Sequence, residues 1–221
     1  MKFLPGIIFL LFFTLSESGF AQGITGRRLV LSYNMHFMSS YGLPARNPNL
    51  RNLNDAFIIN TNHIFEMDWI LSRSWVIGPD WHTFKIHSQS LREERAFLLN
   101  NSGFGFHIKT FSTRKGGIAP LGFWWKLRVY RNTGTATREI DDSYAGSYQQ
   151  WDMSISLGKQ VSFKNYFLFN IGVGFDSNNM YYRFEEDTYI TRNNLEYEVK
   201  DSLLAHQVLF IKLGLGWLVG K

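Results

Sequence analysis

Histidine and serine residues lie near one another at several points of this chain, and these residue types can form a nucleophile and its general base. His36 precedes Ser39 by three residues, and His206 lies near the other end of the chain. Acyl transfer requires a hydroxyl, an imidazole and an orienting acid within hydrogen-bond reach. Six histidines in 221 residues produce such neighbours by chance, and no specific motif surrounds these. His36, Ser39 and His206 are therefore catalytic candidates only, and we expect the chain not to be an enzyme.

Metal and nucleotide chemistry have weaker support. His82 and His87 have no second ligand pair at a useful spacing, and the chain has no cysteine to supply thiolate. The run Gly172-Val173-Gly174 is not followed by a helical pattern, so it does not resemble a phosphate-binding loop. We therefore expect no cofactor and no metal.

The chemistry-bearing residues fall on segments in which apolar and polar residues alternate. In Leu204–Leu218, for example, Leu209, Ile211 and Leu213 alternate with residues such as Lys212 and Gly214. A period of two indicates a β-strand with two unlike faces. The pattern predicts eight strands, at Arg28–Met38, Asn60–Leu71, Trp75–His87, Gly103–Phe111, Leu121–Arg131, Tyr148–Gly158, Tyr166–Asp176 and Leu204–Leu218.

The connections between these strands are expected to alternate between long and short, as in a barrel with both termini at one end. The third strand is interrupted by Gly78-Pro79, and proline weakens a strand interior. The predicted fold is all-β: an eight-stranded antiparallel up-and-down transmembrane β-barrel. The outer loops, among them Asn178–Asp201, are rich in Asn and Tyr, a composition that suits surface recognition.

The N-terminus carries the pattern of a secretory signal. Met1-Lys2 is followed by a short apolar run to Leu15, and Gly19-Phe20-Ala21 supplies small residues before a cleavage site. We expect a signal peptide at 1–21 and one outer-membrane β-barrel domain at 22–221. The absence of cysteine excludes disulfides. A net charge of +5 with scattered basic residues gives no sign of nucleic-acid binding.

The charged residues on the polar faces indicate which face of the sheet points into the barrel and which points outward. A soluble barrel that turns its apolar face inward would expose its polar face, whereas a soluble sandwich would expose apolar rows or bury the charges. An aromatic content of 17% also suits the aromatic girdles of a membrane barrel. We therefore expect a lumen charge network, formed by Arg28, Glu66, Asp68, Lys109, Lys126, Arg128, Asp152, Asp176 and Lys212.

Several local motifs also resemble a known group of proteins. Ile118-Ala119-Pro120-Leu121-Gly122, the aromatic-Gly-aromatic start of the fourth strand and the Gly-x-Gly pattern of the last two strands are similar to small outer-membrane β-barrel proteins of Bacteroidota, eight-stranded barrels of the OmpA-like or porin-like type. The resemblance implies a barrel fold and an outer-membrane location in a Gram-negative envelope, and it implies no site.

These observations favour a non-catalytic outer-membrane barrel with a structural or surface-interaction role. The alternatives are a lipid-modifying outer-membrane enzyme of the acyltransferase or deacylase type, a narrow pore, and a soluble barrel that binds an apolar ligand. The expected partners are outer-membrane lipid, the barrel-assembly machinery and an extracellular ligand at the loops.

Overall fold

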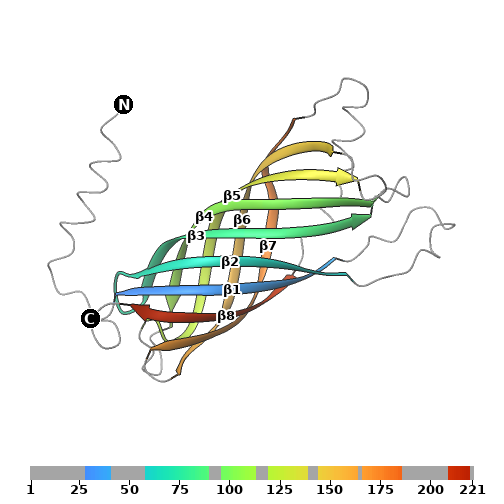
Figure 1. The fold of residues 1–221 in the computed structure, drawn as a ribbon. Helices are drawn as coiled ribbons and strands as arrows, with labels where there is room; N and C mark the ends of the chain where they lie inside the picture. The colour runs from blue at the N-terminus through green and yellow to red at the C-terminus, as the bar shows by residue number, and fades with distance from the viewer. Residues whose placement is uncertain are drawn as a thin grey trace, which may run out of the picture.

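Eight antiparallel β-strands form the protein (Figure 1). The computed structural model describes residues 28–40, 58–89, 96–112, 119–138, 144–163, 166–185 and 209–219. The expected signal peptide at 1–21 and His206 lie outside these residues, as does most of the loop expected at Asn178–Asp201. The strands are β1 (Leu29–Ser40), β2 (Ile58–Ile70), β3 (Trp75–Gln89), β4 (Ala96–Phe111), β5 (Gly122–Arg138), β6 (Tyr144–Phe163), β7 (Phe167–Glu185) and β8 (Leu209–Val219).

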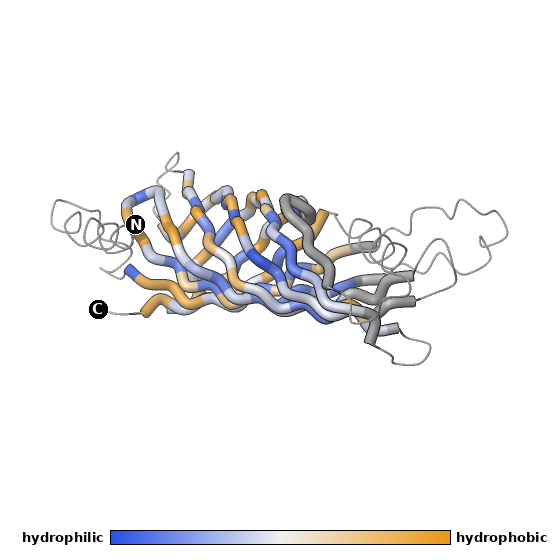
Figure 2. Tube along the Cα trace, turned by 90° about the horizontal axis from the view of Figure 1, so that it is seen from above, coloured by the Kyte–Doolittle hydropathy of each residue, from blue (hydrophilic) through white to orange (hydrophobic). Residues whose placement is uncertain are grey.

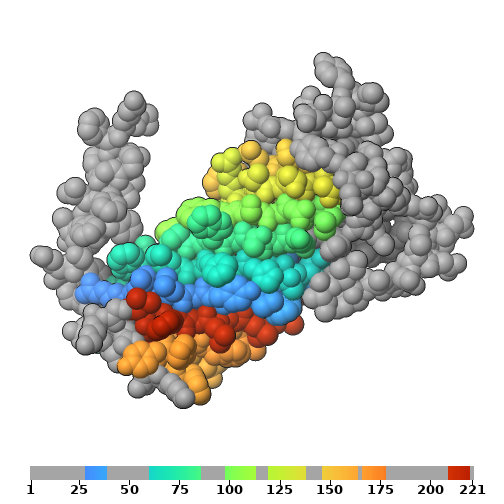
Figure 3. Space-filling model, viewed as in Figure 1, coloured from blue at the N-terminus to red at the C-terminus, as the bar shows by residue number. Residues whose placement is uncertain are grey.

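The strands close into a barrel in sequence order, and β1 pairs with both β2 and β8. The predicted fold class is therefore confirmed. The described residues contain no helix that is long and apolar enough to cross a membrane. In the space-filling view β8, β1, β2 and β3 lie side by side (Figure 3).

The register fixes the tilt of the strands. Following hydrogen-bonded neighbours sideways from Leu29, the ladder passes through all eight strands to Leu209, which precedes Phe210, the partner of Met38. The ladder thus returns to β1 at position 39, displaced by ten residues from position 29. With a rise of about 3.3 Å per residue and a strand spacing of about 4.8 Å, this displacement gives a tilt of about 40°.

The two faces of the barrel wall differ in polarity. Along β8 exposed and buried residues alternate without a break, and the outward positions are Leu209, Ile211, Leu213, Leu215 and Trp217. Hydrophobic and hydrophilic residues alternate along the other strands as well (Figure 2). The exposed apolar side chains form a continuous belt around the outside, while charged and amide side chains are buried inside.

Seven of the strands are longer than the apolar pattern predicts, whereas β8 begins at Leu209, and its expected start at Leu204 lies outside the described residues. β4 begins at Ala96 rather than Gly103, β5 continues to Arg138, and β7 continues to Glu185. The expected alternation of loop lengths fails at one connection, the one after β4. The segment 112–121 after β4 is longer than 90–95 after β3 and 139–143 after β5. Residues assigned to the long loops instead continue the hydrogen-bonded ladder, which needs no apolar side chains.

Gly78 and Pro79 are accommodated inside β3 by a local gap in its pairing. The β2–β3 ladder runs from Asn62↔Phe84 to Glu66↔Asp80 and resumes at Trp69↔Ile77. A Cβ atom at Gly78 would overlap the backbone carbonyl of Met67, so only glycine permits this close approach. On its other side β3 pairs with β4 without interruption, and the strand continues past the proline.

Candidate functional site

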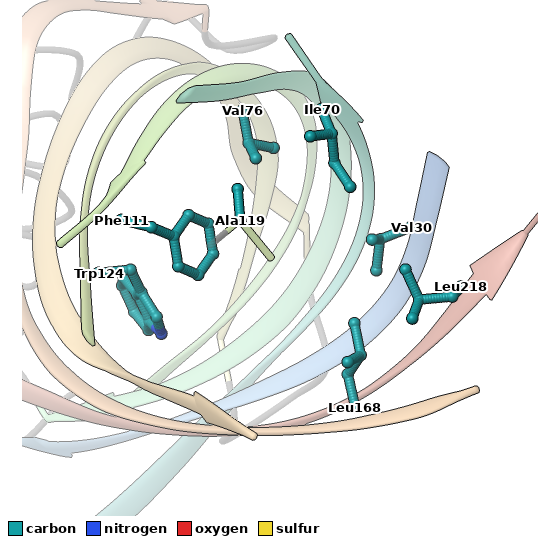
Figure 4. Close-up of a cluster of buried hydrophobic side chains, with 8 residues drawn as sticks. All are labelled: Val30, Ile70, Val76, Phe111, Ala119, Trp124, Leu168 and Leu218. Carbon is teal, nitrogen blue, oxygen red and sulfur yellow. The ribbon is translucent and has the colours of Figure 1, made fainter. Parts of the chain in front are cut away.

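The barrel lumen is the candidate site, because it gathers the titratable side chains. We call the end where β1 begins and β8 ends the lower end, and the opposite end the upper end. An apolar cluster fills the lumen at the lower end, and in Figure 4 its side chains point inward from separate strands. The cluster consists of Val30, Ile70, Val76, Phe111, Ala119, Trp124, Leu168 and Leu218.

Ala119 belongs to this cluster although it lies between strands. Its backbone N–H donates to the carbonyl of Arg73 at 2.7 Å, which ties the segment between β4 and β5 to the turn between β2 and β3. Trp124 contributes the largest ring, which lies against Gly158 and Gly172, where a Cβ atom would collide with it. Glycines in the barrel wall thus make room for this apolar cluster, which we call the plug.

Above the plug, one carboxylate holds two lysines. Glu66 Oε1 accepts hydrogen bonds from Lys126 Nζ at 2.7 Å and from Lys212 Nζ at 2.8 Å. All three side chains are at most 1% exposed. They come from β2, β5 and β8, so the contact spans the lumen and links the last strand to the second. Two cations on one carboxylate leave a local excess of positive charge.

A second carboxylate lies beside the first on β2. Asp68 Oδ1 is 2.6 Å from His107 Nε2, and Asp68 Oδ2 accepts a hydrogen bond from Lys109 Nζ at 3.2 Å. Lys109 Nζ also donates to Gln160 Oε1 at 2.8 Å. This group connects β2 with β4 and β6.

Asp80 and Arg128 form the third ion pair. Arg128 Nε and Nη2 both donate to Asp80 Oδ1, at 2.9 and 2.6 Å. The guanidinium carbon lies 3.9 Å from the centre of the Tyr130 ring. His82 Nδ1 is 2.6 Å from Arg128 Nη2, and its other ring nitrogen contacts Asn132. Charge and ring stacking together fix the guanidinium in the lumen.

Amide groups extend the network toward the upper end. Asp152 Oδ2 accepts hydrogen bonds from Asn132 Nδ2 at 2.6 Å and from Gln150 Nε2 at 2.7 Å. The Tyr148 hydroxyl donates to Asn101. These buried carboxylates and amides therefore obtain partners from their own strand and from other strands, as buried polar groups require.

The described part of the lumen nearly balances its charge. Five buried carboxylates face four buried Lys or Arg side chains, and all but Asp80 were expected there. The expected residues Glu66, Asp68, Lys109, Lys126, Arg128, Asp152, Asp176 and Lys212 are all at most 2% exposed. Arg28 differs from the expectation. It is exposed at the lower end, because β1 begins only at Leu29 and the lumen there is occupied by the apolar cluster.

Sequence reasoning missed three members of the network, Asp80, His82 and His107, which lie at buried positions and contact its charges. His107 lies at the same parity as Lys109 on β4, so the alternation of that strand places it inside. The pattern around Asp80 is broken by Gly78-Pro79, which concealed its inward position. Its parity with Val76 and Phe84 on β3 was the available signal.

The catalytic candidates are not brought together in the part of the chain that the structure describes. His36 is completely buried, and its ring stacks on Phe210 with centroids 4.0 Å apart. Ser39 lies three residues further along β1, and its side chain, like His206, lies outside what the structure describes.

One set of side chains has the composition of a metal site. Ligand atoms of Glu66, Asp68 and His107 lie within 4.8 Å of one another. Three ammonium groups already contact the two carboxylates, namely Lys126, Lys212 and Lys109. These cations satisfy the negative charge that a metal would require, so the set fits a salt-bridge network better than a metal centre.

Comparison with known proteins gives distant fold matches alone. No family model matches the chain, and no curated protein matches it. Among solved structures, Neisserial surface protein A is 11% identical with a TM-score of 0.44, over 86% of this chain and 96% of that one. The N-terminal β-barrel domain of Pseudomonas aeruginosa OprF is 9% identical with a TM-score of 0.41, over 86% and 97%. These likenesses are too distant to carry an argument, so function must be argued from the residues themselves.

Proposed function

We propose that this protein is a barrel of a Gram-negative outer membrane, with a non-catalytic structural or surface-interaction role. The observation that supports this most is the distribution of polarity across the wall. Trp81, Phe104 and Phe123 are 67%, 57% and 65% exposed, whereas Lys126, Arg128 and Lys212 are fully buried. A protein in water would gain by the reverse arrangement.

The apolar belt has the height that a membrane requires. On β7 the exposed apolar positions run from Phe167 to Phe175, and on β8 from Leu209 to Trp217. At about 3.3 Å per residue and a tilt of about 40°, each row is about 20 Å tall between terminal Cα atoms, close to the roughly 25 Å apolar band of outer-membrane barrels. The resemblance to barrels of Bacteroidota is consistent with this location and stays an expectation.

The filled lumen favours a structural or surface role over a pore. The apolar cluster occupies the lower end, and above it each Lys or Arg side chain is held by a carboxylate. An ion would have to displace both layers to cross. The acyltransferase alternative has no support from the described residues, since His36 faces Phe210 inside the barrel.

Fractionation of expressing cells tests this proposal. We expect the protein in the outer-membrane fraction, with a gel mobility that changes when the sample is boiled. Reconstituted in planar bilayers, it should show no steady conductance. Recovery in the soluble fraction, with mobility unaffected by heating, would overturn the membrane assignment. Steady single-channel currents would instead support the pore. Exchanging 186–208 for a short turn then tests the surface role, because an unchanged surface phenotype would remove these residues from it.

A further inference from the structure

Charges of opposite sign are segregated between the two sides of the barrel wall. Among the residues whose side-chain exposure the structure describes, every carboxylate is buried in the lumen. Every exposed charged side chain in the same set is basic, and these are Arg28, Arg73, Lys85, Arg131 and Lys159. An ordinary soluble surface mixes both signs. The outer face of this wall therefore favours an anionic partner.

Two of these cations lie at the upper edge of the apolar belt. Arg131 on β5 pairs with Phe104 on β4 and with Trp151 on β6, which are 57% and 45% exposed. One outward position further up, the same three strands carry Ser102, Thr133 and Gln149. The change from apolar to polar therefore occurs at Arg131.

Lys85 occupies the corresponding place on β3. The outward positions of this strand change from Trp81, 67% exposed, to Thr83 and then to Lys85. Lys85 lies two strands from Arg131, across β4. From the strand spacing and the rise per residue, their Cα atoms are about 16 Å apart along the wall. The two cations are therefore spread along the edge and do not form a single pocket.

Arg131 is oriented by a neighbour, and this contact uses one of its five N–H donors. Its Nη2 donates to Gln149 Oε1 at 2.5 Å. A guanidinium has five N–H donors, and its planar fork matches the oxygens of a phosphate. An acyl chain covering Phe104 and Trp151 would bring its headgroup to the level of this fork.

We propose that the upper collar, formed by Lys85, Arg131 and Gln149, binds the phosphorylated headgroups of lipids in the leaflet at the upper end. This inference rests on the proposed membrane location. The belt supplies the contact with acyl chains, and the collar supplies the charge and the hydrogen bonds. A lipid headgroup fits better than free phosphate, because Arg131 adjoins Phe104 and Trp151 at the edge of the belt and the two cations are too far apart to enclose one anion.

Native mass spectrometry of the refolded full chain tests the collar. The wild type and K85Q/R131Q are incubated in detergent micelles with equal amounts of phosphatidylglycerol and phosphatidylcholine that have the same acyl chains. We expect the wild type to retain phosphatidylglycerol in preference to phosphatidylcholine. Removing each cation of the upper edge should lower the ratio of bound phosphatidylglycerol to bound phosphatidylcholine about fivefold. The matched control S102A/T133A changes the neighbouring outward pair without changing charge, and it should keep the wild-type ratio.

The outcomes separate the collar from the membrane assignment. An unchanged ratio in K85Q/R131Q, or an equal fall in S102A/T133A, would overturn the collar while heat-dependent mobility still identified a membrane barrel. Millimolar inorganic phosphate that displaced phosphatidylglycerol completely would identify a phosphate site instead. Recovery of the wild-type protein in the soluble fraction, with a gel mobility that heating does not change, would overturn the proposed function itself. The variant R73Q/K159Q removes cations at the lower end. In this background, adding K85Q/R131Q should lower the ratio of the two bound lipids by the same factor as in the wild type.

Discussion

Removing the Glu66 carboxylate without changing its shape should destabilise the barrel strongly. In Glu66→Gln the amide can no longer balance Lys126 and Lys212, whose ammonium groups lie 2.7 and 2.8 Å from the same oxygen. These distances place the two nitrogens at most about 5.5 Å apart. At an effective dielectric constant of about 20, their repulsion is about 3 kcal/mol. With the lost charge-assisted hydrogen bonds, we expect the free energy of unfolding to fall by about 3–5 kcal/mol.

A second variant distinguishes repulsion from a general packing defect. Lys212→Met leaves Glu66 paired with Lys126, so it should cost less than Glu66→Gln. In the double variant E66Q/K212M one of the two stranded ammonium groups is gone. We expect the double variant to be more stable than E66Q alone by about 1–3 kcal/mol.

Urea unfolding in phosphatidylcholine vesicles, followed by tryptophan fluorescence, measures these free energies if the transition is reversible. Ser102→Ala, on the outer face, serves as the control. The proposed role of Glu66 in balancing Lys126 and Lys212 is contradicted by either of two results. The free energy of unfolding of E66Q lies within about 0.5 kcal/mol of the wild-type value, or the losses of E66Q and K212M simply add in the double variant.

Further substitutions in the same assay test the apolar belt, the close approach of β2 and β3 at Gly78, and the apolar cluster. Phe106→Arg places a charge within the belt and should cost about 2–4 kcal/mol, whereas Thr133→Arg above the belt should cost about 0–1 kcal/mol; equal costs would contradict the assignment of faces. Gly78→Ala forces a Cβ atom against the Met67 carbonyl and should cost about 1–3 kcal/mol, and an unchanged midpoint would show that the strands can separate freely there. Trp124→Ala removes the largest ring of the apolar cluster and should cost about 3–5 kcal/mol; a loss below about 1 kcal/mol would mean that the plug does not support the fold.

The sequence predicts the strands because their two faces differ, and it fails where they do not. In the belt, Leu209 to Trp217 alternates with buried residues at every step, so number, direction and face follow directly. Beyond Arg131 on β5, Thr133 and Thr135 face out, while the inward positions include Asn132 and Gly134. Both faces are polar or small there, and no period remains to mark the strand. Backbone hydrogen bonds alone continue it.

The members of the lumen network follow from the sequence far better than their partners do. Parity along each strand places Glu66 and Lys126 inside, but their contact joins β2 to β5 across the lumen. Such a contact depends on the registers of the strands between the two residues, and eight separate registers together give the displacement of ten residues around the barrel. Pairing therefore required the structure.

Alternation alone does not tell the inner face of a barrel from the outer one. The pairing of opposite charges inside the barrel does. An alternating strand fits a soluble barrel and a membrane barrel equally well, since each has one wet face and one dry face. What differs is which of the two faces lines the lumen. A lumen of eight strands is narrow enough for side chains from opposite walls to meet. Charges that face inward must then pair across it, as Arg128 does with Asp80 and Lys212 with Glu66.

The outer surface of the described wall carries charge of one sign. Once carboxylates are used to balance lysine and arginine inside, their absence from the described outer wall leaves basic residues as the sole charges at the belt edges. A membrane surface is commonly anionic, so cations at its edges gain binding energy where carboxylates would be repelled. One segregation of charge thus serves two purposes. It fills the lumen with paired ions and leaves Arg131 and Lys85 facing the headgroups.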